Sequence, residues 1–189
     1  MKRGSARLEV ARASTLNTKL ALGQIAVFEL SARHSGTLVA TPNFSFTMKL
    51  DSPHCAVRAP DVAAVFRLVV TVEHAEQDSR VALGEVRVAV RAIYRKSADF
   101  SAADEAAVPD YIGIVGWMHV WPYLRAEVQS LSTKLDFPPL LLPVLLSGQT
   151  ADIPVNLVAP SLAQGARASR EAKVTATKGK SKSRARAKR

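Results

Sequence analysis

The chain has 189 residues, of which 26 are Lys or Arg and 16 are Asp or Glu, so its formal charge is +10 and its pI is near 10.2. A hydrophobic share of 48% excludes a disordered polyelectrolyte, and the length suits one domain with appendages. Residues 165–189 carry +9, residues 1–19 carry +4, and residues 20–164 carry −3. We therefore predict a mildly acidic domain over 20–164 between a basic N-terminal extension and a basic C-terminal tail. The total charge does not by itself indicate a nucleic-acid-binding fold.

Cysteine content and targeting signals narrow the class further. Cys55 is the only cysteine, so an intramolecular disulfide and a paired-cysteine metal site are excluded. No apolar stretch of a secretory signal follows the first three residues. The most apolar run, Leu140–Leu146, is broken by Pro143 and is far shorter than the ~20 residues of a spanning helix. These features predict a soluble, cytoplasmic protein with no membrane association.

Strand patterns dominate the first half of the domain. Ile25–Ala32 is an apolar segment with Glu29 and Arg33 at its exposed end, and apolar and polar residues alternate in three more segments, Phe44–Leu50, Phe66–Glu73 and Val86–Tyr94. A short polar link at 76–79 is typical of a hairpin between the last two segments. Because no helical pattern separates the four segments, we predict a four-stranded antiparallel meander.

Helical spacing replaces the alternation after residue 100. Ser101–Asp104 resembles a capping box and predicts a short helical turn that Pro109 ends. Apolar residues then recur every three or four positions from Trp117 to Leu135. Because Pro suits a first turn, we expect this helix to start at Trp121–Pro122. The fold class is therefore α+β, a meander followed by one long helix. From 165 onward few apolar side chains are available for burial, so we expect a disordered tail.

The sequence offers little for catalysis. His54 and Cys55 follow Asp51, but adjacent residues of an extended chain point to opposite sides, which favours a loop over a metal site. His74, Glu76 and Asp78 would share a face, as a two-carboxylate site would, and a solvated hairpin end explains them as well. No nucleophile motif is present. We predict a protein that is not an enzyme and uses no cofactor or metal.

Nucleic-acid signatures are weak in the domain and present only as charge in the tail. The Gly113-x-x-Gly116 sequence has no Lys or Arg between its glycines, so a tight turn that permits close packing before a helix explains it better than a nucleotide clamp. The tail lacks aromatic residues for base stacking. It carries basic residues that either contact a polyanion or an acidic partner, or only keep the chain soluble; they are Lys178, Lys180, Lys182, Arg184 and Arg186.

The apolar residues exceed what one sheet and one helix would cover. Aromatic and Met side chains are spread over the strands and the helix, and a Leu run follows at 140–142. Either a partner subunit or an apolar ligand covers the surplus, or the segments at 97–116 and 137–162 pack over it within one domain. The first two possibilities both indicate a binding module.

The helix region contains a recognisable motif. Trp121-Pro-Tyr-Leu-Arg125, followed by a helix and then Phe137-Pro-Pro-Leu-Leu-Leu-Pro143, resembles the Phe-Pro-Tyr-Ala-Arg and Phe-Pro-Pro-Leu signature of SecB, the bacterial protein-export chaperone. The resemblance covers about residues 22–146. It implies a four-stranded sheet with a long helix, assembled as a dimer of dimers.

The resemblance also implies a function and a site. It implies an ATP-independent holdase for unfolded client proteins, acting in protein transport and folding, with the export ATPase SecA as a partner or an antitoxin as a dedicated client. The client groove would be lined by Phe44, Phe46, Met48, Trp117 and Met118. The motif residues would build the frame: Trp121 by packing, Pro122 at the helix start, Tyr123 and Arg125 in its first turn, and Phe137, Pro138 and Pro139 at the return.

Two departures from the family leave an alternative open. Pro154 interrupts the place of the family's second C-terminal helix, and the chain ends in a +9 tail where the family is acidic. The alternative is a nucleic-acid- or ribosome-associated protein that binds through the tail and uses the sheet for oligomerisation.

Overall fold

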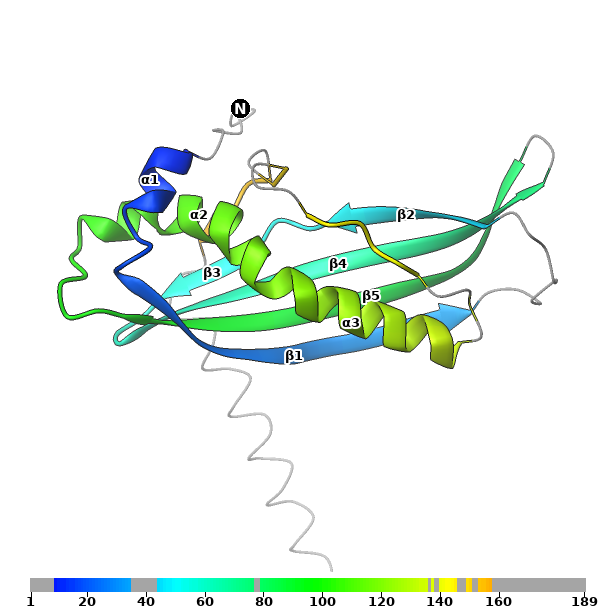
Figure 1. Cartoon of the computed structure of the whole chain (residues 1–189), viewed down its shortest axis with the longest axis horizontal. Helices are drawn as coiled ribbons and strands as arrows, with labels where there is room; N and C mark the ends of the chain where they lie inside the picture. Colours follow the sequence, from blue (N-terminus) through cyan, green and yellow to red (C-terminus); the bar gives the residue numbers. More distant parts are fainter. Residues whose placement is uncertain are drawn as a thin grey trace, which may run out of the picture. The chain divides into compact units, whose positions relative to one another are not determined.

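A six-stranded sheet with a long helix on one face forms the frame of the molecule (Figure 1). The computed structural model describes residues 9–34, 44–76, 79–135, 137, 140–145, 149–150 and 153–157. Its strands are β1 (Leu20–His34), β2 (Phe44–Leu50), β3 (His54–Val57), β4 (Asp61–Glu76), β5 (Ser79–Lys96) and β6 (Asn156–Leu157). Four of these correspond to predicted segments. The other two, β3 and β6, have only four and two residues, which is too short to show a period.

The strand order corrects the predicted meander. The order is β1-β5-β4, and two strands pair with the other edge of β4. β3 pairs with residues 62–65 of β4, and β2 pairs with residues 68–74. The predicted hairpin between β4 and β5 is confirmed, with Glu76 opposite Ser79. β1 pairs with β5 along its whole length instead of with β2. Alternation shows which residues form strands but not which edge each strand covers, and here β1 covers the free edge of β5. The α+β class with one long helix stands, with six strands in place of four.

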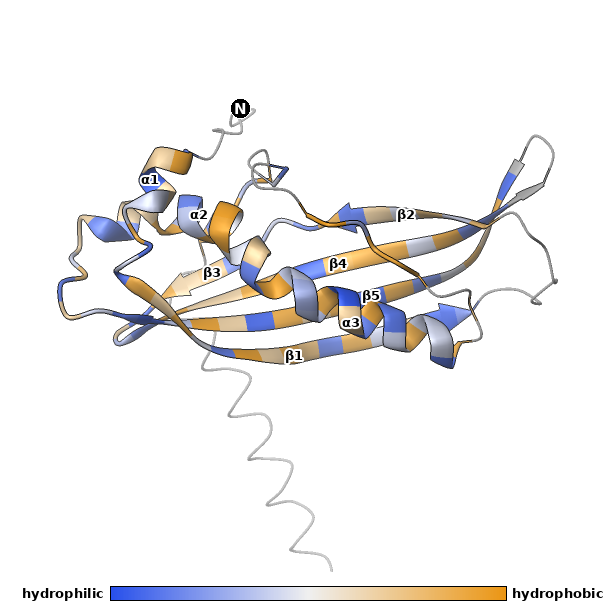
Figure 2. Cartoon of the chain, viewed as in Figure 1, coloured by the Kyte–Doolittle hydropathy of each residue, from blue (hydrophilic) through white to orange (hydrophobic). Residues whose placement is uncertain are grey.

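Alternate residues of the two central strands form the core on one side of the sheet, which we call the helix-side face; the opposite side is the open face. The side chains on the helix-side face are at most 1% exposed. They are mostly β-branched or aromatic, as suits a buried strand, and Figure 2 shows the hydrophobic stretches along both strands. These residues are Val62, Ala64, Phe66, Leu68, Val70 and Val72 on β4 and Val86, Val88, Val90, Ala92 and Tyr94 on β5.

After residues 97–103, the described chain forms four consecutive helical segments. They are a 3₁₀ turn (Asp104–Ala107), α2 (Val108–Tyr111), a π-helical turn (Ile112–Gly116) and α3 (Trp117–Lys134). The predicted turn after Ser101 is confirmed, since the Asp104 carboxylate accepts a 2.7 Å hydrogen bond from the Ser101 N–H. Pro109 does not end it, because a proline in the first turn of α2 lacks only an N–H that has no helical partner there.

The start predicted for the long helix is wrong, because Pro122 lies inside α3. Pro122 lacks the N–H that would bond to the carbonyl of Met118, but both residues are on the exposed side, where water hydrates that carbonyl. On the opposite side, Trp117, Trp121 and Leu124 are buried against the sheet. Burial of about 1.5–3 kcal/mol for each large side chain outweighs the ~3 kcal/mol cost of one interior proline.

Close packing at Gly116 is confirmed, although the segment is helical and not a tight turn. A Cβ built on Gly116 would lie 2.7 Å from Cζ of Phe66 and 3.4 Å from the Tyr94 hydroxyl. The Phe66 and Trp117 rings meet edge to face with centroids 5.1 Å apart. The missing side chain therefore lets the start of α3 approach β4 and β5 closely.

The folded unit begins before residue 20. Helix α1 (Val10–Ser14) and the turn after it bury Ala13 and Leu16. The buried Asp110 carboxylate accepts hydrogen bonds from the Glu9 N–H and pairs with Arg12 at 3.3 Å. The described part of the N-terminal segment therefore docks on α2 instead of extending from the domain.

Candidate functional site

The helix-side face is shared by α3 and an extended segment that we call the strap, residues 140–145. After α3 the chain turns back, and the strap passes over β4 between α3 and β2 (Figure 1). Leu140, Leu142 and Leu145 of the strap join the core, whereas Leu141 and Val144 are 66% and 67% exposed. The strap therefore presents one apolar side to the sheet and the other to solvent.

The predicted apolar face of β2 borders this arrangement. Phe44, Phe46 and Met48 lie opposite His74, Val72 and Val70 on β4. Directly paired residues point to the same side of a sheet, so all three belong to the helix-side face. Phe44 and Phe46 are partly buried against the core, and Met48 is 38% exposed. They form a partly covered apolar band along the sheet edge beside the strap.

The two remaining predicted groove residues do not join this band. Trp117 is fully buried under the start of α3 against Phe66, and its Nε1 meets no hydrogen-bond acceptor among the described residues. Met118 is 42% exposed on the outer side of α3. Adjacent residues of a helix point to different sides, so only one of the two can face the sheet. This was not evident from the sequence, because the helix was expected to start four residues later.

The motif residues have structural places that differ partly from those expected. Trp121 packs as predicted, being 5% exposed, and its Nε1 also donates a 3.0 Å hydrogen bond to the Pro143 carbonyl in the strap. Tyr123 is 49% exposed, and Arg125 is partly buried. Neither side chain has a hydrogen bond or ion pair among the described residues.

Phe137 fixes the return of the chain after α3. Its N–H donates a 2.9 Å hydrogen bond to the Ser132 carbonyl, and its ring, 4% exposed, stacks on His34 with centroids 5.1 Å apart. Pro138 and Pro139 lie outside the described residues, as do the tail residues proposed for polyanions. The part of the motif that the structure describes therefore positions the strap.

Much of the apolar surplus is buried within the chain. The helical segments after β5 and the strap pack on the sheet, and Phe66, Tyr94 and both tryptophans are buried there. This is the alternative in which the chain's own segments cover the surplus. A group of exposed side chains that the sequence had not singled out remains on the edge strand β1: Leu22, Val27, Phe28 and Leu30, each at least 40% exposed. The signal for it was a run of apolar residues on both faces of one strand.

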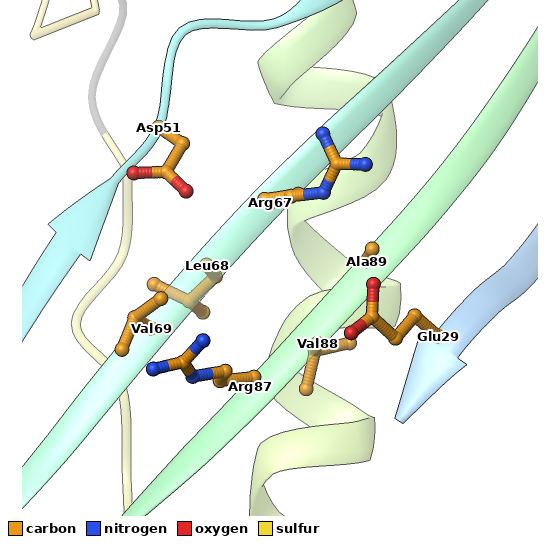
Figure 3. A pocket seen from close by; sticks show the side chains of 8 residues that line it. All are labelled: Glu29, Asp51, Arg67, Leu68, Val69, Arg87, Val88 and Ala89. Atoms are coloured by element: carbon orange, nitrogen blue, oxygen red, sulfur yellow. The ribbon is translucent and has the colours of Figure 1, made fainter. Parts of the chain in front are cut away.

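The open face carries compensating charges. Arg67 and Arg87 lie beside Glu29 and Asp51 around a pocket whose base includes Val69 and Ala89 (Figure 3). The Arg87 Nε donates a 2.5 Å hydrogen bond to Glu85 next to this pocket and lowers the pKa of that carboxyl. Charges of both signs alternate here, which is typical of a solvated sheet face.

Burial shifts the pKa values of titratable groups near the core. His119 packs beside Tyr94 and Tyr111, and burial lowers its pKa. Burial also raises the pKa of the Cys55 thiol to about 12, and exposed His54 points to the other side of β3, as expected. Among the described residues, no group of three or more His, Cys, Asp or Glu side chains is placed to hold a metal ion. Within the same residues, no helix is both long and apolar enough to cross a membrane.

Comparison with known proteins identifies the fold. No family model and no curated protein matches the sequence. Among solved structures, the chain is similar to the Mycobacterium tuberculosis SecB-like chaperone Rv1957, solved in complex with a ChAD peptide from the Rv1956 HigA1 antitoxin. The TM-score is 0.62 at 14% identity, over 74% of this chain and 99% of that one. A protein of unknown function from Streptococcus agalactiae matches at 12% identity over 67% and 98% of the two chains, with a TM-score of 0.25, which carries no argument.

The chain therefore belongs to the α+β class in which a helix covers one face of an antiparallel sheet. Within that class its fold is SecB-like. The likeness extends over almost the whole of the solved chaperone chain, whereas sequence identity is low.

Proposed function

We propose that this protein is an ATP-independent chaperone that holds nonnative polypeptides by their extended, apolar segments. The observation that carries the proposal is the partly covered apolar band of Phe44, Phe46 and Met48 beside the strap, on a SecB-like fold. Aromatic and Met side chains bind many sequences, because burial yields ~25 cal/mol per Å² without directional requirements and thioethers adapt to different partners.

The binding of an antitoxin peptide by the similar M. tuberculosis protein supports a further step. We propose that the clients of this chain include a dedicated one, such as an antitoxin. The apolar band of Phe44, Phe46 and Met48 is short, so we expect one or two short segments of each client to be bound.

An aggregation assay tests the proposed function. A chemically denatured client is diluted into buffer with and without the protein, and light scattering is followed. Wild type should suppress the scattering, and Met48→Lys should suppress it less, because it places a charge in the apolar band. Thr47→Lys is the matched control, since Thr47 is exposed on the same strand but points to the open face. Absence of suppression by wild type, or equal loss in both variants, refutes the proposal.

We propose in addition that the chain forms a homo-oligomer, with the β1 edge as one of the two interfaces that a dimer of dimers requires. Within the described residues, β1 is 15 residues long, pairs with a strand on one side only, and exposes Leu22, Val27, Phe28 and Leu30. Such an edge pairs readily with another copy. The native mass should therefore exceed that of a monomer, and Phe28→Glu should reduce it. A monomeric wild type refutes this assembly.

A further inference from the structure

The strap has the chemistry of the segments that the proposed chaperone would bind. Leu140, Leu142 and Leu145 are 4%, 2% and 8% exposed and face the core, while the residues between them face solvent. The buried positions are two and three residues apart, so the strap has one apolar side although it does not alternate strictly. The strap is thus a short extended peptide, tethered to the protein, that lies with large aliphatic side chains down on an apolar surface.

Among the described residues, two hydrogen bonds connect the strap to α3. Its Leu140 N–H donates a 3.3 Å hydrogen bond to Ser132 Oγ, and its Pro143 carbonyl accepts the 3.0 Å bond from Trp121 Nε1. Within the described part of the chain, no strand ladder includes residues 140–145. The strap is attached by side-chain burial and by two hydrogen bonds, one that it donates to α3 and one that it accepts from α3. This attachment depends little on sequence, so another extended apolar segment can bind in the same way.

The strap lies where a client would meet the apolar band. It passes between α3 and β2 over β4, and β2 directs Phe44, Phe46 and Met48 to the same side of the sheet (Figure 1). A client segment that contacts this band and also buries its side chains on β4 has to occupy the place of the strap over β4, where Leu142 joins the core; we call this place the channel.

We propose that the strap is an intramolecular stand-in for the client, and that the channel beneath it is the client site. An extended segment of nonnative polypeptide with large aliphatic side chains on one side, two or three residues apart, displaces residues 140–145 and places a backbone carbonyl at Trp121 Nε1. This inference rests on the proposed chaperone function and names the class of segment that the site selects and the group that it displaces.

Competition by the strap sets the affinity. If the channel is open in only a fraction of molecules, the apparent dissociation constant equals the intrinsic one divided by that fraction. Weakening the strap increases the open fraction and so tightens client binding. If the strap were instead a fixed part of the binding surface, the same change would weaken client binding.

A pair of strap variants tests the direction of the effect. Leu142→Ala shortens a buried side chain, and Val144→Ala removes a similar amount from the exposed side. Affinity for labelled, reduced and carboxymethylated α-lactalbumin, which stays unfolded in buffer, is measured by fluorescence anisotropy after circular dichroism has verified folding. We expect Leu142→Ala to bind about tenfold tighter, a difference of about 1.4 kcal/mol, and Val144→Ala to bind like wild type. Weaker or unchanged binding by folded Leu142→Ala overturns the proposal.

A measurement on the wild-type protein covers the case in which Leu142→Ala does not fold. The chain has two indole N–H groups. The group of Trp121 bonds to the strap, and the group of Trp117 is buried without an acceptor among the described residues. In a ¹⁵N–¹H spectrum, adding the unfolded client should shift the Trp121 indole resonance and leave that of Trp117 in place. No shift of the Trp121 resonance at saturating client overturns the strap proposal.

A synthetic peptide separates this inference from the proposed function. A peptide with the sequence of residues 137–145 and a solubilising lysine tail should displace the labelled client, whereas one with Ser in place of Leu140, Leu142 and Leu145 should not. If the client binds but both peptides fail to compete, the strap proposal fails and the chaperone proposal stands. If no client binds to wild type, both fail.

Discussion

Gly84 on β5 provides the most direct test of how the chain returns after α3. A Cβ at this position would lie 2.4 Å from the Arg33 carbonyl oxygen on β1 and 2.5 Å from Cζ of Phe137. The first contact is with backbone, which cannot rotate away. The second is with the ring that holds the start of the return. Gly84→Ala therefore has to separate β1 from β5 locally or displace Phe137.

The expected magnitude follows from two opposing terms. Overpacking a well-packed site costs about 1–3 kcal/mol, and replacing a strand glycine by alanine recovers about 0.5–1 kcal/mol. Because the 2.4 Å contact is with backbone, the upper part of the overpacking range applies, about 2–3 kcal/mol, and the net loss in the free energy of unfolding is about 1–2.5 kcal/mol. For a chain of this size, that loss lowers Tm by about 2–10 °C.

Gly23 on β1 is the matched control. A Cβ there would lie 3.4 Å from its nearest atoms, in ordinary contact with Arg95 and the Ile93 carbonyl. Gly23→Ala should therefore be neutral or slightly stabilising, because only the entropic term remains. Thermal melts and urea unfolding of both variants supply the comparison. A Gly84→Ala protein as stable as Gly23→Ala would refute the described packing of Phe137 against β5.

Three further predictions concern charge and reactivity. The hydrogen bond from Lys19, followed by those from Ser101, lowers the pKa of Asp104 to about 2. The Lys19–Asp104 pair therefore stabilises the fold above the ordinary Asp pKa near 3.8, and this contribution is lost as pH falls toward 2. Urea unfolding at a series of pH values should show a smaller loss of stability over this range for Asp104→Asn than for wild type, and equal losses would contradict the prediction. Because burial raises the pKa of Cys55 to about 12, its thiol should not react with a disulfide reagent at pH 8 until the protein is unfolded; rapid reaction of folded protein would exclude the buried position. Deleting residues 165–189, which carry +9, should abolish retention on heparin at low salt and leave suppression of client aggregation unchanged; retention by the shortened chain would assign polyanion binding to the domain.

The helix illustrates why a local rule misplaced a boundary. Pro122 is an unfavourable residue inside a helix, and local preference alone puts it in the first turn. The buried side chains before it, Trp117 among them, keep the helical path from 104 onward, and this contribution depends on the sheet beneath. Because the helix starts four residues earlier than predicted, Trp117 and Met118 lie on different sides of it, and Trp117 is buried instead of exposed.

The candidate site shows a similar division. The alternation in β2 was sufficient to put Phe44, Phe46 and Met48 on one face, because a strand has a period of two whatever it pairs with. It did not show that the strap lies beside them, since Leu140–Leu142 read only as an apolar run. The pairing of Trp121 Nε1 with Pro143 joins residues 22 positions apart and has no local pattern.

The sequence by itself determined the class of the protein: the strand segments, a long amphipathic helix, the core-facing residues of β4 and β5, and the concentration of positive charge at the ends. These follow from periodicity and composition, which act within a few residues of the chain. Only the tertiary structure decided that β1 covers the edge of β5, that Pro122 lies within a continuous helix, and that the strap fills the channel between α3 and β2. Those outcomes depend on burial and hydrogen bonds between segments distant in sequence, where the energy of the whole fold outweighs local preference.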